Sequence, residues 1–151
     1  MKKIEVLKRS ELFRDLDDEQ LALIEKMCTT KEFGAGTVIC KQGVTGENTF
    51  IIEEGLVAII LEVGPLAQRQ VQTATNYETF GWSAMIEPYV STATVKALEK
   101  TRVFAFNGRE LCSLCNHDPE VGCKICRAVA RVIGERLRQA YIQLLGVTQQ
   151  D

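Results

Sequence analysis

The sequence has few of the residues on which most enzymes and membrane proteins depend. It contains one histidine, one tryptophan and three prolines in 151 residues. No apolar run approaches the ~18 residues that a membrane helix needs, and no apolar stretch follows Lys2 and Lys3 to complete an export signal. The net charge of −2 gives no indication of a nucleic-acid partner. These absences predict a cytoplasmic protein with no membrane segment.

The composition that remains is typical of one folded domain. Hydrophobic residues make up 46 % of the chain and charged residues 25 %, which favours a globular protein over a disordered or fibrous one. A chain of this length can bury roughly 70 % of its unfolded surface around one core. We therefore expect residues 1–151 to form a single domain.

The first two thirds of the chain change from helical to strand spacing. Asp17 and Gln20 form a capping-box pattern that predicts a helix from about Asp18 to Met27. From about residue 33 to residue 106, short β-branched and aromatic runs alternate with glycines. The runs are 37–40, 49–52, 57–61, 71–75, 92–98 and 102–106. This spacing predicts about eight antiparallel strands in a β-roll or jelly roll.

The last third of the chain returns to helical spacing. A capping box at Asn107 predicts a short helix over about 108–116. Pro119 suits a first helical position and predicts a long helix over about 119–145, which ends at Gly146. The expected fold class is therefore mainly β with flanking helices (α+β): an eight-stranded antiparallel roll with an N-terminal helix and a short plus a long C-terminal helix.

In this layout the chain resembles the cyclic nucleotide-binding domain of the catabolite activator and of the protein kinase A regulatory subunit. The resemblance covers nearly the whole chain and rests on these positions: Leu12-Phe13, Leu16, Phe33, Gly36, Gly43, Gly46, Phe50-Ile51-Ile52, Gly55, Phe80-Gly81, Ala84, Ala93-Thr94-Val95 and Ala97-Leu98. The alternative is an unrelated cupin-like barrel. The resemblance implies a regulatory, ligand-sensing module that is not an enzyme.

In the family, a phosphate-binding cassette begins at a Phe-Gly-Glu motif. Free N–H groups of a short helix and a following arginine hold the cyclic phosphate, and the glutamate binds the ribose hydroxyl. This chain reads Phe80-Gly81-Trp82-Ser83-Ala84-Met85, and an indole cannot accept that hydrogen bond. The segment Tyr89-Val90-Ser91-Thr92-Ala93-Thr94 has no cation where the family has arginine. The candidate ligand-binding residues are Gly81, Trp82, Ser83, Ala84, Ser91 and Thr92.

The altered cassette predicts a module that does not bind cyclic AMP or cyclic GMP tightly. Loss of both side-chain contacts weakens binding on the order of a thousandfold. No cofactor is required, although the amides of Trp82 to Ala84 leave a site for a weakly bound nucleotide or other small anion. Trp82 either fills the unused cavity or stacks on a flat ligand. Lys96 is the nearest cation in sequence, on an undetermined face of its strand. The alternative is a functional receptor with atypical contacts.

Four of the six cysteines form two pairs near the C-terminus. Cys112-x-x-Cys115 and Cys123-x-x-Cys126, with His117 between them, have a spacing that suits zinc or an iron–sulfur cluster. The same spacing is expected where thiols pack as small apolar groups on a helix face, which is the interpretation we adopt. A metal or redox sensor built on these four cysteines is the second alternative function.

The long helix carries an apolar seam and several basic residues. The seam predicts a homodimer through this helix, or else packing against the chain's own roll. Its members are Cys126, Ala130, Ile133, Leu137, Ala140 and Leu144. The basic residues are interpreted as the solvated side of the helix, and they are Lys124, Arg127, Arg131, Arg136 and Arg138. Only residues 147–151 follow, so no DNA-binding helix-turn-helix is expected, and a separate output protein is a candidate partner.

Overall fold

Two four-stranded antiparallel sheets form a roll, as predicted. The structure is a computed structural model and describes residues 2–146. One sheet has the order β1-β8-β3-β6 and the other β2-β7-β4-β5. The strands are β1 (Thr29–Phe33), β2 (Val38–Cys40), β3 (Asn48–Glu54), β4 (Leu56–Gly64), β5 (Ala67–Thr75), β6 (Thr79–Phe80), β7 (Thr94–Ala97) and β8 (Thr101–Asn107).

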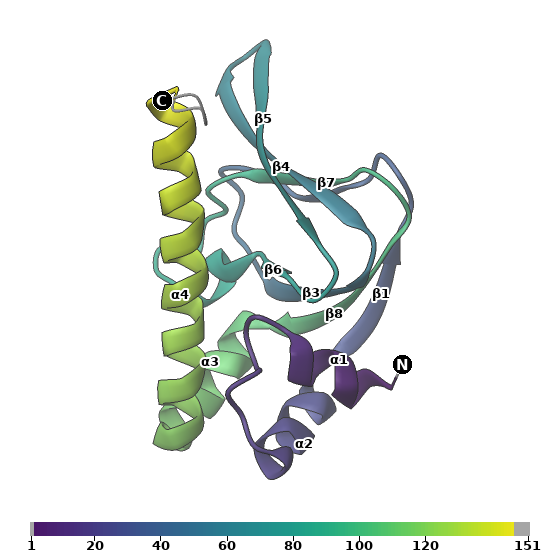
Figure 1. Ribbon diagram of the computed structural model, residues 1–151, viewed down its shortest axis with the longest axis vertical. Coiled ribbons are helices and arrows are strands. Elements are labelled where there is room, and N and C mark those ends of the chain that lie inside the picture. The colour runs from purple at the N-terminus through teal and green to yellow at the C-terminus, as the bar shows by residue number, and fades with distance from the viewer. Residues whose placement is uncertain (1, 147–151) are drawn as a thin grey trace.

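Helices cover one end and one side of the roll (Figure 1). The helices are α1 (Lys3–Arg9), α2 (Asp18–Met27), α3 (Gly108–His117), α4 (Pro119–Leu144) and the short 3₁₀ helix η1 (Trp82–Met85). Helices α1 and α2 lie below the roll, and α4 runs along its side toward the β4–β5 hairpin (Figure 1). None of the helices within residues 2–146 has the length and apolar character needed to cross a membrane.

Three elements are absent from the sequence prediction. In helix α1 the side chains of Val6 and Leu7 are 1 % and 0 % exposed. This tertiary packing stabilises a helix whose local sequence signals are weak. Strand β1 starts ahead of residue 33 because it pairs with β8, although its mainly exposed residues show no alternating pattern. Strand β6 has two residues and depends on pairing with β3.

The apolar core has two parts, separated by β3 and β8. One part lies inside the roll and includes Phe50, Ile52, Val57, Phe80, Val95 and Val103. The other lies against the helices and includes Phe13, Ile24, Ile51, Phe106, Leu111 and Ile125. Successive strand residues point to opposite faces, so Ile51 and Ile52 enter different parts. The segment from Phe80 to Met85 spans the boundary, because Phe80 packs inside the roll and Trp82 against the helical part.

Helix α4 buries one stripe of residues and exposes another. The buried residues are Val121, Gly122, Ile125, Ala128, Val129 and Val132. Of the predicted seam, Ile133 is half-buried and the other residues are exposed. Ile133 packs against the helical part of the core, and Ala140 and Leu144 line a cavity with Leu61 and Val71 of the β4–β5 hairpin. The homodimer and the packing of the seam against the chain's own roll both stay predictions. Gly146, with φ of 62°, follows the end of the helix as expected.

Candidate functional site

The predicted cassette is one tight turn of backbone. Gly81 has φ of 77°, and a Cβ atom there would lie 2.9 Å from the Asn48 carbonyl oxygen, so glycine is required. In η1 the Ala84 amide donates to the Gly81 carbonyl at 3.2 Å. That donor is therefore engaged within the turn, which corrects the expectation that the amides from Trp82 to Ala84 are all free for an anion.

Five of the six predicted ligand-binding residues line one small cavity of about 30 Å³. They are Gly81, Trp82, Ser83, Ser91 and Thr92. The other lining residues are Cys40, Ile59, Phe80, Ala93 and Val95, so none of the ten is charged. The space is about that of one water molecule, whereas small-molecule sites usually enclose roughly 300–1,000 Å³. Burial raises the pKa of the Cys40 thiol to about 12, which keeps this wall neutral.

The sixth residue, Ala84, lies away from the cavity wall. It is 2 % exposed and packs against the start of α3. A Cβ atom at Gly108 would lie 2.2 Å from the Ala84 carbonyl oxygen. This close approach fixes η1 to α3, and it places Ala84 in a structural position.

The segment after η1 brings no cation to the cavity. The Ser91 amide donates to the Val44 carbonyl, and the Gly43 amide donates to the Ser91 carbonyl, both at 2.9 Å. These bonds hold Ser91 against the loop before β3. Further along, Val95 is buried in the roll and lines the cavity, while Lys96 is exposed on the opposite face of β7. The nearest cation in sequence therefore points away from the cassette.

Arg136 lies beside the cassette, although we interpreted it as part of the solvated side of the helix. Its guanidinium carbon is 5.7 Å from the centroid of the Trp82 ring. The guanidinium donates to the Thr79 carbonyl at 3.0 Å and to Gln72 Oε1 at 3.4 Å. Arg136 stands four residues after Val132, so it continues the buried stripe of α4. This four-residue spacing was the signal in the sequence that could have placed Arg136 on the inward face of the helix.

Thr79, next to the cassette, is bound by a side chain that precedes the roll and by a side chain of α4. Its amide donates to Glu11 Oε1 at 2.8 Å, and its carbonyl accepts from Arg136. Its hydroxyl donates to the Phe50 carbonyl at 2.8 Å. Because β6 is an edge strand, its outer backbone groups have no neighbouring strand to bind. The side chains of Glu11 and Arg136 bind the N–H and the carbonyl of Thr79 instead. Burial raises the pKa of Glu11, and the Thr79 hydrogen bond and Arg136 partly oppose this shift.

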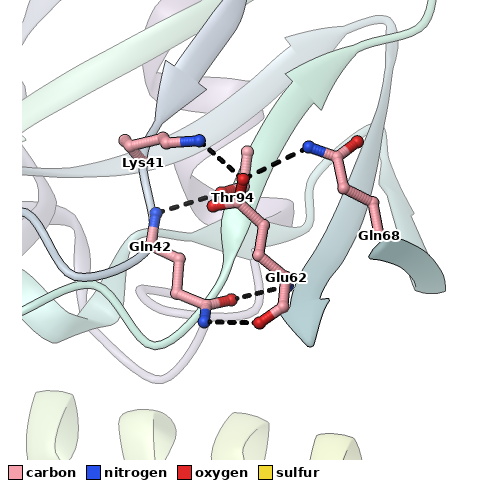
Figure 2. Close-up of polar contacts among 5 residues, drawn as sticks. All are labelled: Lys41, Gln42, Glu62, Gln68 and Thr94. Carbon is pink, nitrogen blue, oxygen red and sulfur yellow. Dashed lines mark hydrogen bonds and ion pairs between the residues drawn. The ribbon is translucent and has the colours of Figure 1, made fainter. Parts of the chain in front are cut away.

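A second polar cluster joins the strand after the cassette to β4 (Figure 2). The Glu62 carboxylate accepts from Lys41 at 2.6 Å, from Thr94 at 3.0 Å and from Gln68 at 3.2 Å. The hydrogen bond from Lys41 is the main cause that lowers the pKa of Glu62. The Gln42 side chain bonds both the backbone N–H and the carbonyl of Glu62, as a neighbouring strand would. Lys41 is thus engaged with Glu62.

Three of the four paired cysteines share one groove, and the fourth lies outside it. Cys112, Cys115 and Cys126 line an apolar groove between α3, α4 and the end of η1, and Cys123 is exposed outside it. Within the described part of the chain, no three histidine, cysteine or acidic residues are placed to hold a metal ion. Burial and the neighbouring thiols raise the pKa of Cys115 to about 12, which disfavours the thiolate that metals bind.

Comparison with known proteins relates this geometry to a family. The family model described as the cyclic nucleotide-binding domain matches residues 30–118. The chain belongs to this family. Over 114 residues it is 28 % identical to a cyclic nucleotide-gated potassium channel of Mesorhizobium japonicum, a match that covers 73 % of this chain and 29 % of the channel. The chain spans 33 % or less of the length of the curated relatives that it matches.

Solved structures share the fold of this cyclic nucleotide-binding domain. The N-terminal domain of a transcriptional regulator from Streptomyces coelicolor is 27 % identical with a TM-score of 0.72, and the match covers 97 % of this chain and 98 % of that one. The regulatory subunit of a cAMP-independent protein kinase A from Trypanosoma brucei is 20 % identical with a TM-score of 0.76, covering 95 % and 50 %. Cyclic nucleotide-binding domains are generally regulatory and non-catalytic.

Proposed function

We propose that this cyclic nucleotide-binding domain is a non-enzymatic regulatory module whose cassette does not bind cyclic AMP or cyclic GMP tightly. The observation that carries the proposal is the cavity of about 30 Å³ with ten uncharged lining residues. A cyclic phosphate transferred there would lose its hydration without gaining a countercharge from any of these ten residues, at a cost of several kcal/mol. The Arg136 guanidinium lies on the Trp82 ring and donates to the Thr79 carbonyl. Entry of the sugar and base would also require Trp82 and its neighbours to move.

Ser91 also lines a larger neighbouring cavity, of about 430 Å³, whose charged lining residues are Lys31, Lys41 and Glu47. Lys41 is already paired with Glu62 at 2.6 Å. Glu47 offers a partner to an arginine introduced at position 91.

A relative with altered ligand dependence fits the proposal. The Trypanosoma brucei protein is the regulatory subunit of a cAMP-independent protein kinase A. The form bound to cAMP in its A site is a triple mutant, and one of the three substitutions replaces threonine with arginine. By analogy, a domain of this fold regulates without cyclic AMP, and an added cation accompanies the bound nucleotide.

Calorimetric titration with cyclic AMP and cyclic GMP tests the proposal. The wild-type chain is expected to bind with Kd of about 1 mM or weaker, and Trp82→Glu/Ser91→Arg is expected to bind at least about a hundredfold more tightly. The two single variants are the controls, because each restores only one of the two lost contacts. Circular dichroism first establishes that all variants are folded. Wild-type binding tighter than about 10 μM contradicts the proposal and supports a receptor with atypical contacts.

We further propose that the module is cytoplasmic and acts as a homodimer through the exposed seam of α4, with a separate output protein as its partner. Leu137 and Leu144 in the seam are 48 % and 82 % exposed. Apolar side chains that repeat at heptad spacing on a helix of 26 residues are suited to a twin helix. The alternative of a cysteine-based sensor has less support, because Cys123 lies apart from the other three thiols.

A further inference from the structure

A wide cavity lies between β1 and β2, which are edge strands of the two sheets. It is the cavity of about 430 Å³ beside Ser91, and this volume is within the range of small-molecule sites. Its lining residues belong to β1, β2, the loop between β2 and β3, β3 and Ser91. Strand β1 lies on the opposite side of the roll from α4 (Figure 1). The cavity shares no lining residue with the exposed seam of α4, so it is separate from the surface of the proposed dimer.

The floor of this cavity is apolar. Phe33 and Phe50 meet there edge to face, with ring centroids 6.3 Å apart. Ile39 and Phe33 pack against the part of the core inside the roll. Val38 and Val44 also line the cavity, and they are 51 % and 53 % exposed. A ligand with an apolar group would therefore remove apolar surface from water here.

Three charged residues line the cavity, and one of them already has a partner. Lys41 forms an ion pair with Glu62 at 2.6 Å (Figure 2). Lys31 and Glu47 are exposed, and within residues 2–146 neither forms an ion pair with the other or with a further residue. The cavity therefore offers one unpaired charge of each sign.

This pair of charges selects among ligands. An anion would gain Lys31 and be repelled by Glu47, and a cation would gain Glu47 and be repelled by Lys31. A molecule that carries one positive and one negative group can form a charged hydrogen bond with both residues. Together with the apolar floor, the charges suit a zwitterion that has an apolar side chain.

We propose that the cavity binds a free α-amino acid with an apolar side chain. Its carboxylate accepts from Lys31, its ammonium group donates to Glu47, and its side chain packs on Phe33 and Phe50. An α-amino acid has no net charge at neutral pH, so it satisfies both charges of the cavity without adding a third.

The position of the cavity connects this ligand to the cassette. Cys40 and Ser91 line both the cavity and the small cassette cavity. The Ser91 amide also donates to the carbonyl of Val44 at 2.9 Å, and Val44 is a further lining residue. A bound amino acid thus stabilises the segment after the cassette and gives the module an input that needs no cyclic nucleotide. The proposal stands whether or not the cassette binds a nucleotide.

Calorimetric titration of the full chain with three related molecules tests the proposal. L-Phenylalanine carries both charges, 3-phenylpropanoate lacks the ammonium group, and 2-phenylethylamine lacks the carboxylate. We expect saturable binding of one L-phenylalanine per chain, with Kd of about 1 mM or tighter. Each of the two singly charged molecules is expected to bind at least about tenfold more weakly.

Variants of the two charged residues assign each contact. Lys31→Met and Glu47→Gln are each expected to lower the affinity for L-phenylalanine at least about tenfold. In Glu47→Gln the preference for L-phenylalanine over 3-phenylpropanoate should disappear, and in Lys31→Met its preference over 2-phenylethylamine should disappear. Lys96→Met and Glu99→Gln are the matched controls, because both residues are exposed and neither lines the cavity. They are expected to leave all three affinities unchanged.

Several results would overturn the proposal. They are absence of saturable L-phenylalanine binding, equal affinity for the three molecules, and equal losses in the cavity variants and the controls. Sedimentation equilibrium tests a second copy as the occupant. A fall of Lys31→Met from the mass of two chains to that of one would assign the cavity to the second copy, which also overturns the proposal.

Discussion

At the scale of single residues, the backbone of Thr79 connects the two ends of the chain to the cassette. Glu11 precedes the roll and Arg136 lies on the last helix, yet both bind backbone atoms of Thr79. Arg136 also covers the face of the Trp82 ring. The position of Trp82 therefore depends on contacts that are far apart in the sequence, and these contacts can be removed one at a time.

Replacement of Glu11 by glutamine is expected to change the pH dependence of stability. Burial raises the pKa of Glu11 above 4.5, so the folded chain holds this proton more tightly than the unfolded chain. Its contribution to stability is complete below 4.5 and is lost as the pH rises through the raised pKa. Glu11→Gln keeps an oxygen for the Thr79 amide, so its free energy of unfolding should fall less over this window, as measured by urea unfolding at a series of pH values.

The control for this measurement is Glu62→Gln. In the wild type, the hydrogen bond that Lys41 donates lowers the pKa of Glu62. The Glu62 carboxylate therefore contributes stability above pH 4.5, and this contribution is lost as the pH falls. The free energies of unfolding of the two variants should therefore depart from that of the wild type with opposite dependence on pH. Parallel curves for Glu11→Gln and the wild type would show that the Glu11 carboxyl has no shifted pKa.

Removal of the Arg136 guanidinium is expected to destabilise the fold. Arg136→Met keeps a long apolar side chain, but the Thr79 carbonyl loses a charged donor and the Trp82 ring loses its cation. The expected loss in the free energy of unfolding is about 1–3 kcal/mol. Arg127→Met, at an exposed position, should change it by less than about 0.5 kcal/mol. Equal effects of the two substitutions in denaturant unfolding would mean that the Arg136 contacts add nothing.

At the scale of elements, α4 has an inward face whose chemistry changes along its length. Its first half buries apolar residues up to Val132, and its second half places Arg136 and Gln143 against the β4–β5 hairpin. Gln143 donates to the Val71 carbonyl. The helix therefore packs on the helical part of the core at one end and forms hydrogen bonds with residues of β5 at the other. Figure 1 shows its course from α3 to the β4–β5 hairpin.

Two glycines of α4 predict opposite effects of the same substitution. Gly134 has no neighbouring atom within 4 Å of an added Cβ, so Gly134→Ala should raise the free energy of unfolding by about 0.5–1 kcal/mol through helix propensity. A Cβ at Gly122 would lie 2.3 Å from the Cys115 carbonyl oxygen, so Gly122→Ala should lower it by about 1–3 kcal/mol. Thermal and denaturant unfolding measure both. A stabilising Gly122→Ala would contradict the close packing of α3 on α4.

At the scale of the whole molecule, the exposed seam of α4 predicts self-association. Sedimentation equilibrium at tens of micromolar should give twice the mass of one chain for the wild type. Leu137→Glu should give the mass of one chain, because a charge in the seam loses its hydration in the dimer. Gln139→Glu is the control with the same change in charge outside the seam. A wild-type chain of single mass under these conditions refutes the dimer.

Much of the architecture could be predicted because its signals are local. The capping box at Asp17 predicted α2 with the bounds that the structure has, and the apolar runs predicted six of the eight strands. The other two, β1 and β6, carry no alternating pattern or are too short for one. Helix α1 was missed for a related reason, since its stability comes from burial of Val6 and Leu7 in a core formed by later parts of the chain.

The sequence by itself determined the roll, the long helix and the lack of charge in the cassette, because periodicity, capping and residue type act over a few neighbours. Only the tertiary structure decided that Lys96 faces outward, that the Ala84 amide is engaged and that Arg136 covers Trp82. It also brought three thiols of the two cysteine pairs into one groove and left Cys123 outside. The reason is physical: these outcomes depend on which strand pairs with which and on the rotation of α4 about its axis, and both follow from burial of apolar surface over the entire chain.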